Sequence, residues 1–446
     1  MANQHRLSFW QLFNLNFGFF GVQIAYALQS ANISRIFATL GADPHQLSFF
    51  WILPPLMGMI VQPLIGKWSD KTWCRMGRRK PYLLVGAIVA VAVMMLLPNA
   101  GSFNLGKAYL FLGLNAAMWF GLFSLIFLDT SINVAMQPFK MMVGDMVCEE
   151  QKAKAYSIQS FLCNAGSLVG YLFPIFFTWI GLANTAPEGI IPDSVIWSFY
   201  CGAAILILCV LFTFFKVKEM PPQEYAEFHG LDAAEAVKED NPGFIRLLKR
   251  APKTFWTVSL VQFFCWAAFL FLWTYTNGAI AETCWGTTDA ASSGYQAAGN
   301  WVGVLFAVEA IGAMLWAFAI PRFKTLRQAY TVSLLIGAAG FLSVFFLHNQ
   351  YLLIVSFLLI GVVWGAMLAI PFTFVTNALT DHIGTYLGLF NCAICLPQII
   401  AAALGGLILN LVGGAQVNMF IAASVLLVCG AAATLLVKEH EQSINN

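Results

Sequence analysis

Long apolar stretches separated by short polar turns run through the whole chain. Twelve of them reach the roughly 20 residues that a helix needs to cross a lipid bilayer. They cover residues 9–38, 46–69, 82–101, 106–138, 155–182, 194–216, 254–281, 298–320, 328–347, 351–376, 384–411 and 416–437. The pattern therefore predicts an all-α integral membrane protein with twelve transmembrane helices.

The longest polar stretch, residues 217–253, lies between the sixth and seventh apolar stretches. We therefore predict an N-terminal six-helix half over 1–216, a cytoplasmic linker over 217–253 and a C-terminal six-helix half over 254–446. Two halves joined in this way are typical of secondary transporters, which bind their substrate between repeats near the middle of the membrane.

Composition supports the membrane assignment and orients the chain. Of its 446 residues, 59% are hydrophobic and 10% charged, whereas soluble proteins carry about 25% charged residues. This excludes a nucleic-acid-binding protein and a secreted disulfide scaffold. With both termini in the cytoplasm, all 23 Lys and Arg residues except Arg35 and Lys107 fall on the inner side. We expect a monomer in contact with membrane lipid, in the cell membrane, and the short tails favour a bacterial inner membrane.

Two carboxyl groups, Asp129 and Glu309, lie at membrane depth, where an ionisable residue is costly and usually functional. Helical periodicity places Asp129, Asn133 and Lys140 on one face, with Gln137 close to it. Burial favours the neutral form of a carboxyl group, which suits reversible protonation. We interpret both as proton-coupling residues. A static structural carboxyl at Asp129 and a neutral packed acid at Glu309 are the alternatives.

Amide and aromatic side chains provide candidate substrate contacts, because amides can both donate to and accept from sugar hydroxyls and aromatic rings can stack on a sugar ring. Those of the first apolar stretch lie mostly on one face, and Asn391 and Gln398, seven residues apart, share another. Hydrogen bonding or packing between helices is the alternative. The predicted substrate-binding residues are Gln23, Tyr26, Gln29, Asn133, Gln137, Trp266, Trp273, Asn391 and Gln398.

Several motifs occur in the order found in one known family. The stretch GKWSDKTWCRMGRRKP at 66–81 resembles the loop between the second and third helices of the major facilitator superfamily. The stretches GVQIAYALQ, VQPLIG, GSLVGY and LGLFNCAICLPQII resemble its glycoside–cation symporter branch, which includes plant sucrose transporters and their animal and bacterial relatives. So does the fourth-stretch series Asp129, Asn133, Pro138, Lys140 and Asp145.

The resemblance implies proton-coupled uptake of a disaccharide or glucoside, such as sucrose or maltose, with Asp129 as the proton carrier. It also implies a cytoplasmic gate, to which we assign Asp70, Arg75, Arg78, Arg79, Lys140 and Asp145. The chain departs from the plant proteins in the seventh and eighth stretches. Trp273, Tyr275, Ala279 and Trp301 occupy positions where the plant proteins carry acids and arginines, which leaves the identity of the sugar open.

Two other functions remain open from the sequence. An exporter of lipophilic drugs or metabolites on the same fold would use the aromatic residues of the seventh stretch. A polytopic membrane enzyme or sensor would show no solute flux, but H-E-x-x-H, G-x-S-x-G and phosphate-binding glycine motifs are all missing, so we predict no enzyme activity. We expect no cofactor and no metal site, with a proton as the coupling ion and sodium as the alternative.

Overall fold

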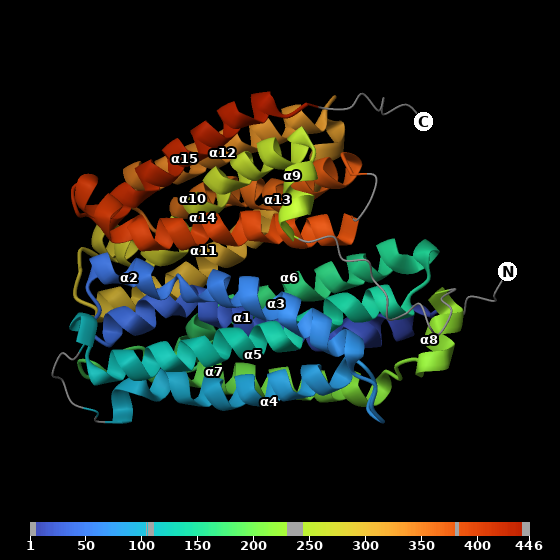
Figure 1. The fold of residues 1–446 in the computed structure, drawn as a ribbon. Helices are drawn as coiled ribbons and strands as arrows, with labels where there is room; N and C mark the ends of the chain where they lie inside the picture. The colour runs from blue at the N-terminus through green and yellow to red at the C-terminus, as the bar shows by residue number, and fades with distance from the viewer. Residues whose placement is uncertain (1–5, 104, 106–110, 230–243, 380–382, 439–446) are drawn as a thin grey trace. The chain divides into compact units, whose positions relative to one another are not determined.

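The computed structural model describes residues 6–103, 105, 111–229, 244–379 and 383–438, and Figure 1 draws the fold. The described residues form helices and no strand, which confirms the all-α prediction. Eleven helical segments in them are long and apolar enough to cross a membrane. α1 is not among the eleven although it has 31 residues, because amides and one arginine interrupt its apolar sequence.

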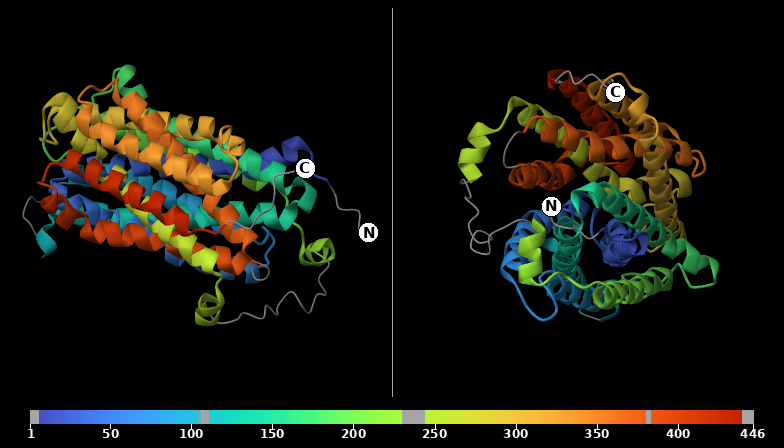
Figure 2. Two further views of the ribbon diagram at one scale, coloured as in Figure 1. Left: turned by 90° about the horizontal axis from the view of Figure 1, so that it is seen from above. Right: turned by 90° about the vertical axis from the view of Figure 1, so that its right-hand side faces the viewer.

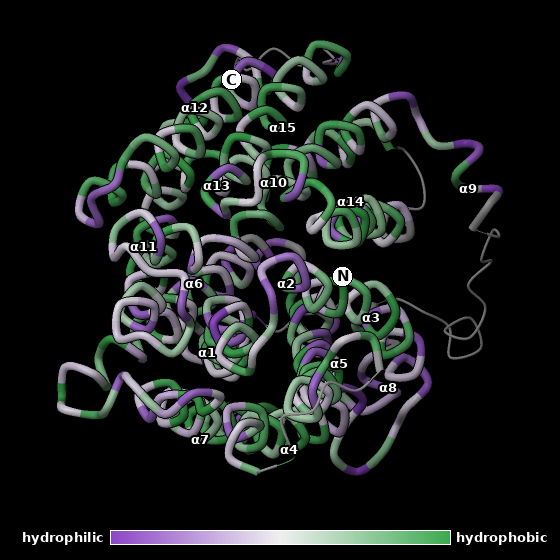
Figure 3. Tube along the Cα trace, turned by 90° about the vertical axis from the view of Figure 1, so that its left-hand side faces the viewer, coloured by the Kyte–Doolittle hydropathy of each residue, from purple (hydrophilic) through white to green (hydrophobic). Residues whose placement is uncertain are grey.

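The helices are α1 (Phe9–Thr39), α2 (Pro44–Phe50), α3 (Leu53–Lys71), α4 (Lys80–Leu96), α5 (Ala116–Met146), α6 (Glu149–Trp179), α7 (Asp193–Lys216), α8 (Pro222–His229), α9 (Phe244–Arg250), α10 (Lys253–Trp285), α11 (Ser293–Ala317), α12 (Leu326–Phe346), α13 (Leu353–Asn377), α14 (Ile383–Leu411) and α15 (Met419–Ala433). Short 3₁₀ helices cover η1 (Leu97–Phe103), η2 (Phe111–Gly113), η3 (Ile320–Arg322), η4 (Gln416–Asn418) and η5 (Thr434–Leu436). In Figure 3 most of the helical tube is coloured hydrophobic.

Two predicted stretches differ from the helices observed. The second stretch divides into two helices: α2 ends at Phe50, and α3 begins at Leu53, just before Pro54 and Pro55. The fourth, predicted over 106–138, is α5. It begins after Asn115, whose side chain caps the helix by accepting from the backbone N–H of Met118, and it continues to Met146. Residues 106–110 of that prediction, Lys107 included, lie outside the described residues.

The chain packs into two compact units. Unit 1 comprises residues 1–30, 57–183 and 190–243, and unit 2 comprises 31–56, 184–189 and 244–446. α1 and α3 are each divided between the units. The predicted domain boundaries at 216 and 253 stay a prediction, although α7 ends at Lys216 and α10 begins at Lys253.

Unit 1 is built by close helix contacts. α4 packs against α5 and α7, and α6 packs against α7. Figure 1 shows α4 and α5 side by side. Small residues permit these contacts. A Cβ atom at Gly86 of α4 would lie 2.6 Å from the backbone nitrogen of Ala135 in α5, and one at Gly170 of α6 would lie 2.7 Å from the carbonyl oxygen of Ile24 in α1. Unit 1 therefore fixes α5 beside α4.

Unit 2 is built in the same way by α10 to α15 together with α2. α11 and α12 both pack against α13, and α15 lies against α10 and α12, so the orange and red helices run side by side in Figure 2. A Cβ atom at Gly312 of α11 would lie 2.5 Å from the carbonyl oxygen of Leu358 in α13. Most of α10 is buried within this unit.

Candidate functional site

Asp129 is buried in the middle of α5, with 2% of its surface exposed. Its Oδ1 accepts a hydrogen bond from Nε2 of Gln29, which lies on α1 and is equally buried. Its Oδ2 is also buried and has no hydrogen-bond partner among the described residues. The carboxyl group therefore has one neutral donor and no paired cation, an arrangement that suits a neutral acid better than an anion.

Asn133 follows Asp129 by one helical turn and is held at both ends of its amide. Its Nδ2 donates to the backbone carbonyl oxygen of Asp129 over 2.8 Å, and its Oδ1 accepts from Nε2 of Gln62 over 2.7 Å. Gln62 belongs to α3 and was not among the predicted site residues. Gln137, one turn further on, leaves its Oε1 buried and without a partner among the described residues. These amides and Asp129 extend along one side of α5.

The three predicted α1 residues have different surroundings. Gln23 is 7% exposed, and its Cβ lies against α6, 3.1 Å from where a Cβ at Gly166 would be. Tyr26 is 39% exposed, the most open of the three. Gln29 is buried, and its Nε2 donates a hydrogen bond to Oδ1 of Asp129. Unit 1 thus brings Gln29, Asp129, Asn133 and Gln62 together.

Glu309 lies on α11 in unit 2, with 5% of its surface exposed. Its carboxylate makes no hydrogen bond or ion pair with the residues that the structure describes. Its backbone lies against Gly361 of α13, where a Cβ atom would meet the Glu309 carbonyl oxygen. Glu309 belongs to unit 2, whereas Asp129 belongs to unit 1.

The aromatic residues of α10 form a cluster in unit 2. Trp266 and Trp273 both contact Trp364 of α13, with ring centroids 5.7 and 5.8 Å apart. Trp51 stacks on Trp273 at 6.0 Å, and its indole N–H donates to Ser34. The indole Nε1 of Trp266 is buried and without a partner among the described residues. The cluster offers flat apolar surfaces and one unused N–H donor.

The predicted pair on α14 is less regular. Gln398 is 8% exposed, and its Nε2 donates to the backbone carbonyl oxygen of Ile394 over 3.0 Å. This bond spans the turn that contains Pro397, which lacks a backbone N–H. Asn391 is partly exposed on the same helix. Both lie in unit 2.

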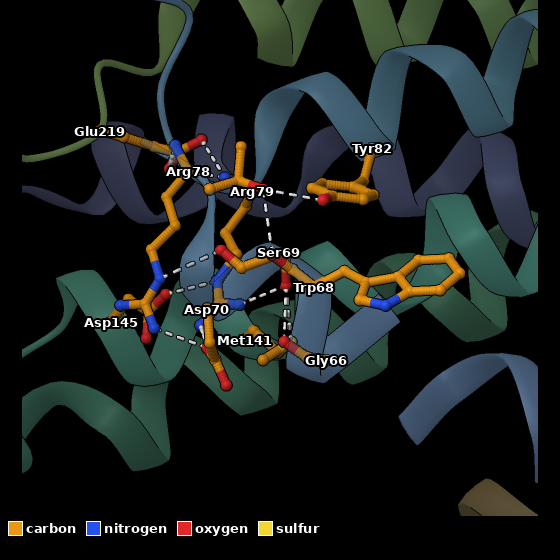
Figure 4. A network of polar contacts seen from close by, with 11 residues as sticks. Gly66, Trp68, Ser69, Asp70, Arg78, Arg79, Tyr82, Met141, Asp145 and Glu219 are labelled. Atoms are coloured by element: carbon orange, nitrogen blue, oxygen red, sulfur yellow. Dashed lines mark hydrogen bonds and ion pairs between the residues drawn. The ribbon is translucent and has the colours of Figure 1, made fainter. Parts of the chain in front are cut away.

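A charge cluster forms at the start of α4 in unit 1 (Figure 4). Arg79 is 2% exposed and donates to Asp145 of α5 and Asp70 of α3, each over 2.7 Å. Arg78 donates to the same oxygen of Asp70 over 2.6 Å. Burial alone would lower the pKa of Arg79, but Asp145 and Asp70 outweigh it and raise that pKa above its usual value. The cluster links α3, α4 and α5.

Sequence reasoning missed Glu219, which lies three residues beyond α7. Its carboxylate accepts from the backbone N–H groups of Arg78, Arg79 and Lys80, at 2.6 to 3.1 Å. This is where an anion is favoured, because the first N–H groups of a helix have no partner within it. Gly77 makes room: its φ is +116°, and a Cβ there would lie 2.7 Å from Glu219.

Arg75 and Lys140, both assigned to the gate, are exposed and take no part in the ion pairs described above, and their role stays a prediction. Arg75 is exposed and makes no hydrogen bond or ion pair with described residues. Lys140 is exposed on α5, more than one turn before Asp145. The guanidinium of Arg78 instead lies over the rings of Trp73 and Tyr225, at 5.2 and 4.8 Å.

Arg35, which the charge count placed outside the membrane, is buried within α1, with 1% of its surface exposed. Its partners are neutral. Nε donates to Oε1 of Gln296 over 2.7 Å, Nη1 to Oδ1 of Asn300 over 3.0 Å, and Nη2 to Oδ1 of Asn184 over 2.8 Å. Nη2 also donates to the Gln296 carbonyl oxygen, and Gly299 leaves the space that the guanidinium fills. Hydropathy gave no sign of this cluster, because its partners are far apart in sequence.

Comparisons with known proteins agree with this architecture. A sucrose transport protein of rice, Oryza sativa subsp. indica, is 24% identical over 431 residues, covering 86% of this chain and 79% of that protein. Proton-associated sugar transporter A of Mus musculus is 27% identical over 165 residues, 37% of this chain. The matched part is only 22% of the mouse protein's length.

The fold also matches a solved structure. A bacterial homologue of the human lysosomal transporter Spinster, in an inward-facing and unoccupied conformation, superposes with a TM-score of 0.67 at 17% identity, covering 96% of each chain. The family model described as Major Facilitator Superfamily matches residues 15–295 and 288–446, nearly the whole chain. This multi-pass membrane protein is therefore a transporter that belongs to the Major Facilitator Superfamily.

Proposed function

We propose that this chain is a proton-coupled symporter that carries a disaccharide or other glucoside, sucrose- or maltose-like, into the cytoplasm by alternating access. The observation that carries the proposal is Asp129, a buried carboxyl group with one neutral donor and one oxygen free to hold a proton. The names of the rice and mouse relatives, a sucrose transport protein and a proton-associated sugar transporter, support the sugar and the coupling ion.

The proposed cycle follows from the chemistry of these groups. Asp129 takes up a proton from the outer side, sugar then binds, and the proton leaves once the site opens to the cytoplasm. One charge moving through a membrane potential of 100 mV supplies about 2.3 kcal/mol, which concentrates a neutral sugar about 50-fold. Glu309 is a second coupling carboxyl in this proposal, since it too is buried without a described partner.

Sugar recognition is assigned to amides and aromatic rings. Gln23, Tyr26, Gln137, Asn391 and Gln398 supply donors and acceptors for hydroxyl groups. Asn133 contributes through the amide that Gln62 orients. Trp266 and Trp273 offer ring faces, and the unpartnered Trp266 N–H offers a donor.

The charge cluster of Asp70, Arg78, Arg79 and Asp145 is the proposed cytoplasmic gate. Its ion pairs stabilise one arrangement of α3, α4 and α5, so breaking them would shift the populations of the transport states. With the gate on the cytoplasmic side, both termini also lie in the cytoplasm. The proposed location is a bacterial inner membrane. We propose that the protein acts as a monomer.

The experiment is uptake of radiolabelled sucrose and maltose into vesicles that contain the purified protein, with an imposed proton gradient. Asp129→Asn should abolish accumulation against a gradient while retaining sugar exchange across the vesicle membrane. Asp193→Asn, the same change at an exposed position on α7, is the matched control and should transport normally. Uphill accumulation by Asp129→Asn would refute the coupling assignment, and dependence on a sodium gradient would replace the proton.

An exporter of lipophilic compounds is the second candidate, favoured by the aromatic cluster of Trp51, Trp266, Trp273 and Trp364. A binding screen by thermal shift separates the two. Stabilisation by disaccharides supports import, whereas stabilisation by lipophilic cations and not by sugars supports export.

A further inference from the structure

Asp129 and Gln29 face each other with one hydrogen bond made and one missing. Nε2 of Gln29 donates to Oδ1 of Asp129. The other oxygens of the same two groups, Oε1 of Gln29 and Oδ2 of Asp129, are both buried and without a partner among the described residues. Both are acceptors when the carboxyl group is charged, so neither can satisfy the other.

A carboxylic acid and a primary amide are complementary along their polar edges. The amide N–H donates to the acid carbonyl oxygen, while the acid O–H donates to the amide oxygen. Here the bond from the Gln29 amide to Oδ1 of Asp129 exists, whereas Oδ2 of Asp129 and Oε1 of Gln29, the two atoms of the other bond, lack partners among the described residues. In a cyclic acid–amide pair, a single proton on Oδ2 of Asp129 would satisfy both atoms, because its O–H would donate to Oε1 of Gln29.

We infer that Gln29 and Asp129 form an acid–amide pair that one proton closes, with Gln29 as the positioning residue of the proton site. This inference rests on the proposed coupling role of Asp129, and it assigns Gln29 to the proton rather than to the sugar. No bond to carbon forms or breaks: proton uptake creates one O–H bond and one hydrogen bond, and proton release removes both.

The neighbouring groups leave Gln29 as the partner. The amide of Asn133 is already engaged by the Asp129 backbone and by Gln62. On α5 the nearest charged residues towards the C-terminus are Lys140 and Asp145, about 16 and 24 Å away along the helix axis. Towards the N-terminus α5 carries no charged residue. No ion pair reaches the Asp129 carboxyl among the described residues.

The pair has a mechanical consequence within unit 1. Gln29 belongs to α1 and Asp129 to α5, so two hydrogen bonds join these helices when the proton is bound and one when it is absent. Protonation therefore tightens the contact between α1 and α5. Such a change in contacts is what a coupling ion needs to favour one conformation over another.

Infrared difference spectroscopy of the full-length purified protein tests the pair. The carbonyl band of neutral Asp129 is assigned as the acidic-pH band that Asp129→Asn removes. In the wild type this band should lie at the low wavenumber of a hydrogen-bonded acid, and Gln29→Met should move it upward. Ser30→Ala, a neighbouring buried change whose hydroxyl bonds only within α1, should leave it in place.

A band that Gln29→Met does not move would overturn the pair while leaving Asp129 as the proton carrier. If Asp129→Asn removes no such band, both the pair and the proposed coupling fail, so the two failures are distinguishable. Because Gln29→Met could misfold, an exchanged variant gives a second test. Gln29→Glu combined with Asp129→Asn puts the acid on α1 and the amide on α5.

The exchanged variant should regain a pH-dependent acid band and proton-driven accumulation above that of Asp129→Asn alone. A monodisperse exchanged variant with neither property would overturn the pair.

Discussion

Two guanidinium groups in this protein are equally buried but have opposite partners. Arg79 in unit 1 is 2% exposed and pairs with the carboxylates of Asp70 and Asp145. Arg35 in unit 2 is 1% exposed and donates to three amide oxygens and one backbone carbonyl oxygen. One charge is neutralised, and the other is only solvated by dipoles.

The difference decides what remains after the arginine is removed. Without Arg79, the carboxylates of Asp145 and Asp70 keep their charge but lose the guanidinium that both contact, and the Asp145 side chain is only 17% exposed. Without Arg35, only neutral acceptors are left, and the charge that was costly to bury has gone as well. The acid-paired cluster should therefore be the more sensitive of the two, although the Arg35 side chain makes four hydrogen bonds and the Arg79 side chain three.

The largest expected effect is that of Arg79→Met. Removing one partner of a buried ion pair costs about 3–5 kcal/mol, seen as a lower unfolding temperature in detergent. Arg75→Met, in the same loop but exposed and without described contacts, should change stability by less than about 0.5 kcal/mol. Equal unfolding temperatures for the two variants would contradict the role of the cluster.

Arg35→Met should have a smaller effect, about 1–3 kcal/mol, because it removes a donor from neutral acceptors rather than a cation from carboxylates. The measurement is again the unfolding temperature. If Arg35→Met costs as much as Arg79→Met, the chemistry of the partner does not set the cost and the comparison fails.

Asp70→Asn should have the smallest effect. The Asp70 side chain is 47% exposed, and ion pairs of this kind contribute about 0.2–1 kcal/mol. The effect should shrink between low salt and 1 M salt, where the screening length is about 3 Å. The cost of Arg35→Met should not change with salt. A salt-independent effect of Asp70→Asn would mean that its contacts are not electrostatic.

The sequence predicted the all-helical membrane fold because length and hydropathy are local properties of each stretch. It placed the end of α5 too early, at 138, because hydropathy falls where the helix continues to Met146. That last turn pairs with Arg79, a contact that no local pattern reports. The break between α2 and α3 was missed for a similar reason, because both halves are apolar.

The candidate site was predicted in part. Asp129 was singled out because a carboxylate in an apolar stretch is conspicuous, and Asp70, Arg78 and Arg79 because their motif is familiar, and the roles assigned to them stay predictions. Gln62 and Glu219 were missed, because nothing in the local sequence distinguishes them from other amides and linker acids. Their roles follow from contacts with residues far away in the sequence. Arg35 was only counted as a charge on the outer side, because its partners lie 149 to 265 positions away in sequence.

The division of α1 between the two units differs from that of α3 in the residues at which it falls. Residues 9–30 belong to unit 1 and 31–39 to unit 2, and from Val22 to Thr39 the helix has neither glycine nor proline, where helices usually kink. In α3 the division falls just after Pro54 and Pro55. α1 is thus an unjointed rod attached at both ends, through Gln29 in one unit and Arg35 in the other. The division of α3 instead lies beside two prolines, residues at which a helix is usually interrupted or kinked.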